Sequence, residues 1–152
     1  MKQTLVFVPI ILSNVVQMLL MKPELYVKNL ILQPPSYVFA IVWNVIYLLF
    51  GYYLYNVFEQ DEPFVTWIVF LWMCNLLLNM IWSPIVFRYK KYTVGVYMTV
   101  GMILTLLGML VSTKDVVSKS VLLPYIAWLI VALVLNVELV RKYKKNLVFE
   151  KN

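Results

Sequence analysis

One segment of the chain, residues 33–51, reads QPPSYVFAIVWNVIYLLFG and sets the pattern for the rest. Pro34 and Pro35 fix φ and cannot continue a helix from upstream, so they mark the point where a new helix begins. The residues that follow are apolar over a length sufficient to cross a bilayer. Trp43 and Tyr47 are four residues apart and therefore share one helix face. We interpret this face as one wall of a pocket around which the other helices close.

The composition is that of a membrane protein. Of the 152 residues, 63% are hydrophobic and only 13% are charged, and the mean hydropathy is +0.84. Apolar runs of about 20 residues are typical of transmembrane helices rather than barrel strands. Five such runs are present, at residues 3–21, 36–58, 64–87, 93–112 and 120–140. We therefore predict an all-α integral membrane protein, a single domain over residues 1–152, built as a bundle of five transmembrane helices.

The distribution of Lys and Arg predicts the topology. With five spans, the N-terminus shares a side with the connections 59–63 and 113–119, and this side carries only Lys2, Lys114 and Lys119 of the 13 basic residues. Since Lys and Arg gather on the cytoplasmic side, we expect a cytoplasmic C-terminus. The net charge of +6 then reflects topology and attraction to anionic lipid headgroups, so no nucleic-acid partner is expected.

The sequence excludes several kinds of chemistry. It has no His and one Cys, Cys74. General base catalysis by His, haem ligation by His and zinc sites that contain His are therefore excluded. A disulfide within the chain and a metal site built from several cysteines are excluded as well. Cys74 lies in the middle of an apolar run and is interpreted as a packing residue. We predict no metal site and no obligatory cofactor.

Two later spans carry amide side chains on the same helix face as a tryptophan. In the third span Trp82 follows Asn79 by three residues, and in the fifth Trp128, Ala132 and Asn136 recur every four residues. Together with the face described above, they are typical of an aromatic-walled cavity in which a few amides orient a flat hydrophobic ligand. The alternative is that Trp and Asn simply pack the bundle. At bilayer depth Asn79 and Asn136 either orient the ligand or lock helices together, and we expect at least one of them to contact ligand.

Small residues recur in the fourth span. Gly95 and Thr99 are four residues apart, as are Gly101 and Thr105. This spacing lets helix backbones approach closely. Close contact within the bundle is the plain interpretation, and a homodimer through this face is the alternative.

Two shorter features concern the cytoplasmic end of the expected bundle. The connection 22–35 is more apolar than an ordinary loop. Two interpretations stay open for it: a lid over the bundle, or an interfacial segment without a gating role. Pro84, near the end of the third span, is expected to bend or weaken the last helical turn.

Three blocks of the chain stand out by residue type and spacing. They are Pro34-Pro35, Val38-Phe39, Val42-Trp43, Tyr47 and Leu49-Phe50-Gly51; Leu76-x-Leu78-Asn79-x-x-Trp82-Ser83 with Phe87; and Leu123-Pro124-Tyr125-x-x-Trp128 followed by Ala132 and Leu135-Asn136. In order and spacing these blocks resemble the second-, third- and fifth-helix signatures of the TspO/MBR family, the translocator proteins or tryptophan-rich sensory proteins. The resemblance covers nearly the whole chain.

This resemblance implies a protein of a bacterial cell membrane that binds porphyrins or other hydrophobic, sterol-like ligands and acts as a sensor, regulator or transporter. The residues expected to form the ligand site are Trp43, Tyr47, Asn79, Trp82, Trp128, Ala132, Leu135 and Asn136. Some relatives promote light-dependent porphyrin breakdown through tryptophans that match Trp43 and Trp128. A porphyrin-degrading enzyme with these two catalytic residues is therefore one alternative, and a structural membrane module without ligand is another.

The chain also departs from the family pattern. The family usually has a Lys-Pro-x-Trp run before the Pro-Pro pair, where this chain has Asn29-Leu30-Ile31-Leu32. In the fifth helix, Val137 replaces the aromatic residue of the proposed sterol motif. These differences argue against ligand access of the usual kind through the first connection, and against sterol recognition by that motif.

Overall fold

The computed structural model describes residues 2–20, 35–60 and 62–149, and within these ranges every regular element is a helix. The elements are η1 (Lys2–Phe7), α1 (Val8–Leu20), α2 (Ser36–Glu59), α3 (Val65–Ser83), η2 (Pro84–Arg88), α4 (Tyr92–Ser112) and α5 (Val116–Phe149). In the described part of the chain, four helices are long and apolar enough to cross a membrane, and α1 is a shorter apolar helix. The prediction of an all-α membrane bundle is confirmed.

The first span differs in detail from the expected helix over 3–21. It begins as a 3-10 helix of six residues, η1, and continues as thirteen residues of α1. Pro9 explains the change, because proline lacks an N–H group and is tolerated only in the first turn of an α-helix. At rises of about 2.0 and about 1.5 Å per residue the two pieces reach about 31 Å, close to the thickness of a hydrocarbon core.

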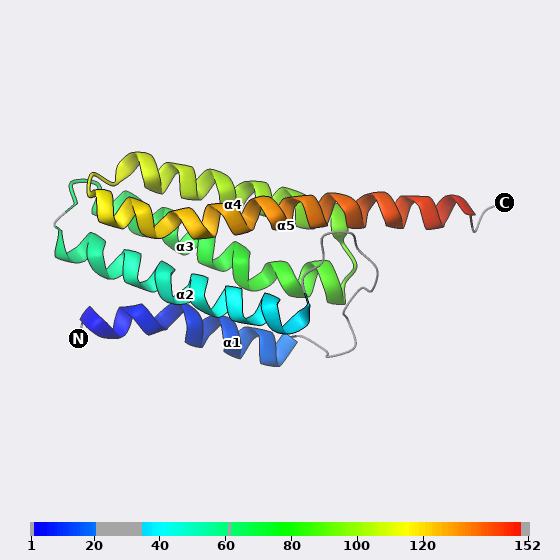
Figure 1. Cartoon of the computed structure of the whole chain (residues 1–152), viewed down its shortest axis with the longest axis horizontal. Coiled ribbons are helices and arrows are strands. Elements are labelled where there is room, and N and C mark those ends of the chain that lie inside the picture. Colours follow the sequence, from blue (N-terminus) through cyan, green and yellow to red (C-terminus); the bar gives the residue numbers. More distant parts are fainter. Residues whose placement is uncertain (1, 21–34, 61, 150–152) are drawn as a thin grey trace.

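The helices form a closed ring in the order α1, α2, α5, α4, α3. Each packs on the next, and α3 also contacts α1. In Figure 1 the helices lie side by side along the horizontal axis and alternate in direction, with the N-terminus at one end and the C-terminus at the other. The connections after α2 and α4 lie at the N-terminal end, as the alternating topology requires (Figure 1). Which end faces the cytoplasm stays a prediction.

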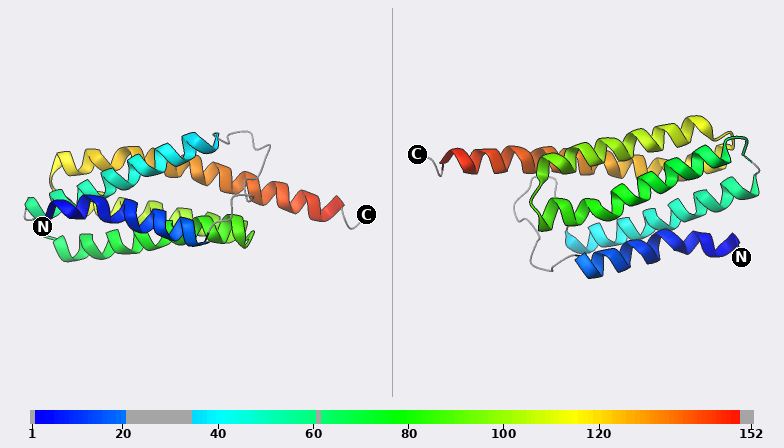
Figure 2. Two further views of the ribbon diagram at one scale, coloured as in Figure 1. Left: turned by 90° about the horizontal axis from the view of Figure 1, so that it is seen from below. Right: turned by 180° about the vertical axis from the view of Figure 1, so that it is seen from behind.

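The fifth helix is longer than the expected span of 120–140. It begins at Val116 and ends at Phe149, so its 34 residues measure about 51 Å, which exceeds the hydrocarbon thickness of a bilayer. Both views in Figure 2 show its C-terminal part extending past the other helices. The apolar pattern of the sequence indicates only the part of the helix that can cross the membrane. The charged residues from Arg141 onward continue the helix beyond this apolar stretch.

At the N-terminal end of the bundle, Glu62 ties two connections together. Its buried carboxylate accepts hydrogen bonds from the backbone N–H groups of Lys114 and Asp115 at 2.8–2.9 Å. Beside it, the hydroxyl groups of Tyr53 and Thr113 are 2.6 Å apart. The connection after α2 is therefore fastened to the connection between α4 and α5.

Proline and glycine shape the opposite end of α3 and its contact with α4. The α-helical pattern stops at Ser83, and Pro84 opens the π-helical turn η2, which confirms the expected weakening of this turn. Gly95 is buried, and a Cβ there would collide with the Val86 side chain. At Gly101, the other predicted glycine, a Cβ would lie 3.3 Å from the Leu78 side chain of α3. The close contacts predicted for the small residues are thus made within the chain, and the homodimer stays a prediction.

Candidate functional site

A chain of hydrogen bonds crosses the interior of the bundle. Tyr47 of α2 donates its hydroxyl proton to Asn79 Oδ1 of α3 at 2.6 Å, and Asn79 Nδ2 donates to Tyr125 Oη of α5 at 2.6 Å. Tyr125 donates to Asn75 Oδ1 at 2.7 Å, and Asn75 Nδ2 donates to the Met102 carbonyl oxygen of α4 at 2.9 Å. Four helices are joined by one continuous polar chain.

This hydrogen-bond chain uses both polar atoms of Asn79. Its side chain is buried, as are those of Tyr47, Asn75 and Tyr125. Buried polar groups lower the stability of a protein unless they are hydrogen-bonded, and here each of the four finds a partner. The geometry therefore gives Asn79 a helix-locking role. Whether it also contacts ligand stays a prediction.

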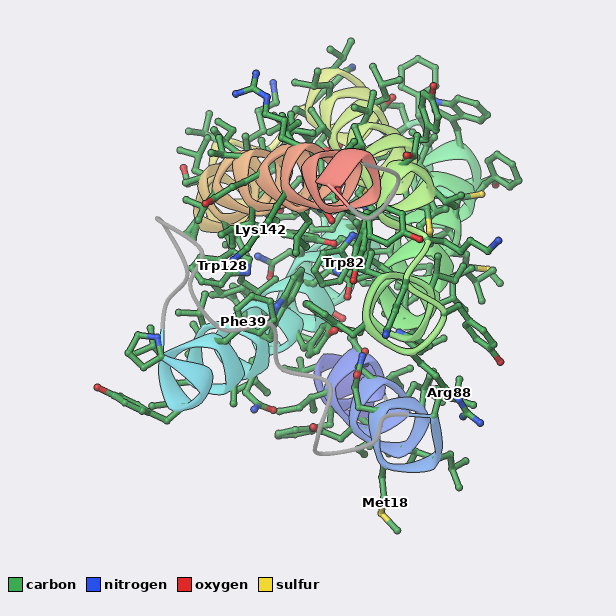
Figure 3. The ribbon with its side chains drawn as sticks, turned by 90° about the vertical axis from the view of Figure 1, so that its right-hand side faces the viewer. Met18, Phe39, Trp82, Arg88, Trp128 and Lys142 are labelled. Atoms are coloured by element: carbon green, nitrogen blue, oxygen red, sulfur yellow. The ribbon has the colours of Figure 1, made fainter. Side chains whose placement is uncertain are left out.

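Next to this chain lies a cluster of four aromatic rings, Phe39, Trp43, Trp82 and Trp128, which we call the tryptophan cluster. The Phe39 ring centroid is 6.1 Å from that of Trp43, 6.5 Å from that of Trp82 and 5.5 Å from that of Trp128. Trp43 and Trp128 also meet edge-on at 6.4 Å. Figure 3 shows Phe39, Trp82 and Trp128 pointing into the space between their helices, whereas Met18 points outward. Phe39 is thus the common neighbour of the three indoles.

Three polar atoms near these rings lack hydrogen-bond partners. They are Trp82 Nε1, Trp128 Nε1 and Asn136 Oδ1, each buried and unpaired among the residues that the structure describes. Trp82 and Asn136 are only 5% and 0% exposed. Buried polar groups ordinarily have a hydrogen-bond partner, so these atoms are candidates for polar contacts with a bound molecule. Two donors and one acceptor are therefore available at this site.

An apolar groove of about 320 Å³ opens between α2 and α5 on the outer surface of the bundle. It is lined by Ile41, Val42, Val45, Ile46, Pro124, Ala127, Trp128 and Val131. Ile41 and Val45 are among its exposed residues and face the lipid. Trp128 lines the groove and also contacts Phe39 and Trp43, so this side chain belongs both to the groove wall and to the tryptophan cluster.

The structure brings together most of the residues predicted from sequence. Trp43 stacks on Tyr47 at 5.6 Å, which places both on one inward face. Along α5 the side chains turn inward, from exposed Pro124 through half-buried Trp128 to buried Ala132 and Asn136. This drift follows from a four-residue spacing on a helix of 3.6 residues per turn. Leu135 is buried as well.

Two contributors were missing from the predicted site. Phe39 is the common neighbour of the tryptophans, and Tyr125 links Asn79 to Asn75. Phe39 precedes Trp43 by four residues, so helical spacing already puts it on the same face. Tyr125 carried no such signal, because its partners lie on another helix. The proposed lid at 22–35 falls outside the described residues except at Pro35, which directly precedes α2.

A five-helix bundle with tryptophans gathered inside it defines a class of small polytopic membrane proteins with an aromatic interior. The chain belongs to the TspO/MBR family, whose model matches residues 5–141. It is similar to the tryptophan-rich protein TspO of Archaeoglobus fulgidus, at 27% identity over 107 residues, which cover 68% of each chain. It is also similar to protein CrtK of Rhodobacter capsulatus, at 27% identity over 108 residues, which cover 68% of this chain and 67% of CrtK.

Proposed function

We propose that the protein binds a flat hydrophobic ligand of the tetrapyrrole class at the tryptophan cluster and acts as a sensor, regulator or transporter in a cell membrane. The observation that carries this proposal is the arrangement of three indoles around one aromatic ring, with two indole N–H groups unpaired. Indole faces stack on flat conjugated rings, and a few polar atoms in an apolar site fix the orientation of a ligand.

Phe39 has a defined role in this proposal. Its ring occupies the centre of the cluster, so it stands where a ring of the ligand would lie, and it must swing aside before ligand binds. The groove between α2 and α5 offers a route from the bilayer to this point, because Trp128 borders both. A ligand dissolved in lipid then reaches the cluster without crossing the aqueous phase.

Quenching of tryptophan fluorescence by protoporphyrin in detergent tests this proposal. Quenching should saturate, and Trp43→Leu or Trp128→Leu should weaken binding while leaving the helix content unchanged. Trp67→Leu is the matched control, because Trp67 is 51% exposed on the outer face of α3 and stacks only on Phe70 among the described rings. Equal affinity for all three variants and the parent would place the ligand elsewhere.

A second candidate function is light-dependent breakdown of porphyrin. The edge-on contact between Trp43 and Trp128 favours it, because an indole next to a bound macrocycle is placed to donate an electron to its excited state. Under illumination, the absorption spectrum of bound porphyrin should then change faster with the parent than with the Trp43→Phe, Trp128→Phe double variant. If the spectrum changes at the same rate in the parent and the double variant at equal porphyrin occupancy, the two tryptophans take no part in a breakdown reaction, and only the binding proposal remains.

A further inference from the structure

Asn136 Oδ1 is an unpaired acceptor and Trp82 Nε1 an unpaired donor, and both lie close to Gly95 of α4; we call them the amide–indole pair. A Cβ atom placed on Gly95 would lie 2.9 Å from Asn136 Oδ1 and 3.6 Å from Trp82 Nε1, so both atoms border the same point on α4. Neither has a hydrogen-bond partner in the described part of the chain. Trp82 belongs to α3 and Asn136 to α5, and both side chains are nearly fully buried.

The hydrogen bonds around Asn136 fix which of its atoms faces the indole. Asn136 Nδ2 donates to the Ala132 carbonyl oxygen at 2.9 Å and to Thr99 Oγ1 at 3.0 Å. A carbonyl oxygen only accepts, and the Thr99 hydroxyl proton is already donated to the Gly95 carbonyl oxygen at 2.9 Å. A flipped amide would lose both bonds. The acceptor of the amide–indole pair is therefore held in place.

We propose that the amide–indole pair recognises a lactam or other cis secondary amide on the ligand. Such a group presents C=O and N–H on neighbouring atoms of one edge, so its oxygen accepts from Trp82 and its N–H donates to Asn136. A carboxylate has no proton to offer Asn136, and a ketone or ester only accepts. This inference rests on the proposed ligand site.

The tryptophan cluster places a flat ring beside the pair. Phe39 stacks on Trp82 with the ring planes 23° apart. A planar ring that takes the place of Phe39 therefore lies against Trp82, whose Nε1 lies close to the same point on α4 as Asn136 Oδ1. The recognised ligand is thus a planar ring system with the lactam at its edge. A water molecule between the two atoms, or a direct bond between them after a small rotation of the indole, are the alternative outcomes.

Two probes that differ by one methyl group test the proposal on the full chain in detergent. 2-Quinolinone is a flat bicyclic lactam, and N-methyl-2-quinolinone keeps the carbonyl but lacks the N–H group. The parent protein should bind 2-quinolinone at least about tenfold more tightly, since a site built for a donor discriminates against a ligand without one. Both compounds should move the indole N–H proton resonance of Trp82, which is assigned by its loss in Trp82→Phe. Equal affinities in the parent would overturn the proposal.

Variants separate hydrogen bonding from crowding by the methyl group. In Asn136→Leu the ratio of the affinities for 2-quinolinone and its N-methyl derivative should fall to about one, because the acceptor is gone. In the control Trp128→Phe, which leaves the amide–indole pair intact, the preference should persist whatever the affinity. A preference that survives Asn136→Leu would show that the methyl group is rejected by size alone, and the proposal would be wrong.

Protoporphyrin binding, measured alongside, keeps this inference distinct from the proposed function. Protoporphyrin binding without a preference between the quinolinones would leave the proposed function standing and refute the amide–indole pair. A clear preference without protoporphyrin binding would support the pair and refute the tetrapyrrole assignment. Binding of none of the three would refute both.

Discussion

Replacing Asn79 by Leu should cut the hydrogen-bond chain in the middle of the bundle. The two side chains are similar in size, so the change is chiefly the loss of two interhelical bonds, to Tyr47 and to Tyr125. Such bonds contribute on average about 0.6 kcal/mol each in membranes. The Tyr47 hydroxyl, which is buried, also loses the acceptor of its proton, at a cost of about 1–3 kcal/mol. We expect a total loss of about 2–4 kcal/mol.

Thermal unfolding in detergent, followed by circular dichroism, measures this loss. For a chain of this length it corresponds to a decrease in Tm of about 5–15 °C. The double variant Tyr47→Phe, Asn79→Leu should be no less stable than Asn79→Leu alone, because it also removes the Tyr47 hydroxyl that would otherwise lack an acceptor. If the stability losses of Tyr47→Phe and Asn79→Leu add in the double variant, the two side chains are not coupled and the helix-locking role is refuted. If Asn79→Leu melts like the parent and loses ligand affinity instead, Asn79 is a ligand contact and not a helix lock.

Four further predictions concern the ends of the bundle. Glu62→Ala should lower the free energy of unfolding by about 3 kcal/mol, because the partly buried hydrogen bonds from two backbone N–H groups to its carboxylate are lost, and denaturation in detergent measures this. Gly51→Ala should cost about 1–3 kcal/mol in the same assay, because its Cβ would collide with the Val6 carbonyl oxygen. The backbone N–H of Ser118 donates a hydrogen bond to the Asp115 carboxylate and lowers its pKa. The stability that this carboxylate provides is therefore present above its ordinary pKa of about 4 and is lost as the pH falls through the lowered value. Asp115→Asn should remove this part of the dependence of Tm on pH. A reporter fused after Asn152 should be cytoplasmic, and activity outside the cell would reverse the topology.

Much of the architecture could be predicted because hydrophobic length and helical spacing are local properties. The four long spans begin and end within a few residues of the predicted limits, apart from the charged continuation of α5. The break at Pro84 and the helix start at Ser36 follow from proline chemistry. The 3-10 start of the chain was missed, because apolar content does not distinguish a 3-10 helix from an α-helix.

The site was predictable only as far as single helices determine it. Asn79 and Asn136 look alike in the sequence, as each is an amide close to a tryptophan on one face. The structure separates them, because Tyr47 and Tyr125 use both polar atoms of Asn79, whereas Asn136 keeps an unpaired oxygen. These differences depend on how neighbouring helices are rotated and shifted against one another. Periodicity within one helix carries no information about that.

The hydrogen-bond chain has a direction, and this limits how the bundle can move. Every proton from Tyr47 to Met102 is donated the same way, and the last acceptor is a backbone carbonyl, which never donates. The order cannot be reversed, so the chain has one arrangement and cannot serve as a two-position switch. It therefore holds the four helices together at one fixed point inside the bundle. If a ligand binds at the tryptophan cluster as proposed, we expect α2 and α5 to separate on one side of this fixed point, while the end fastened by Glu62 stays closed.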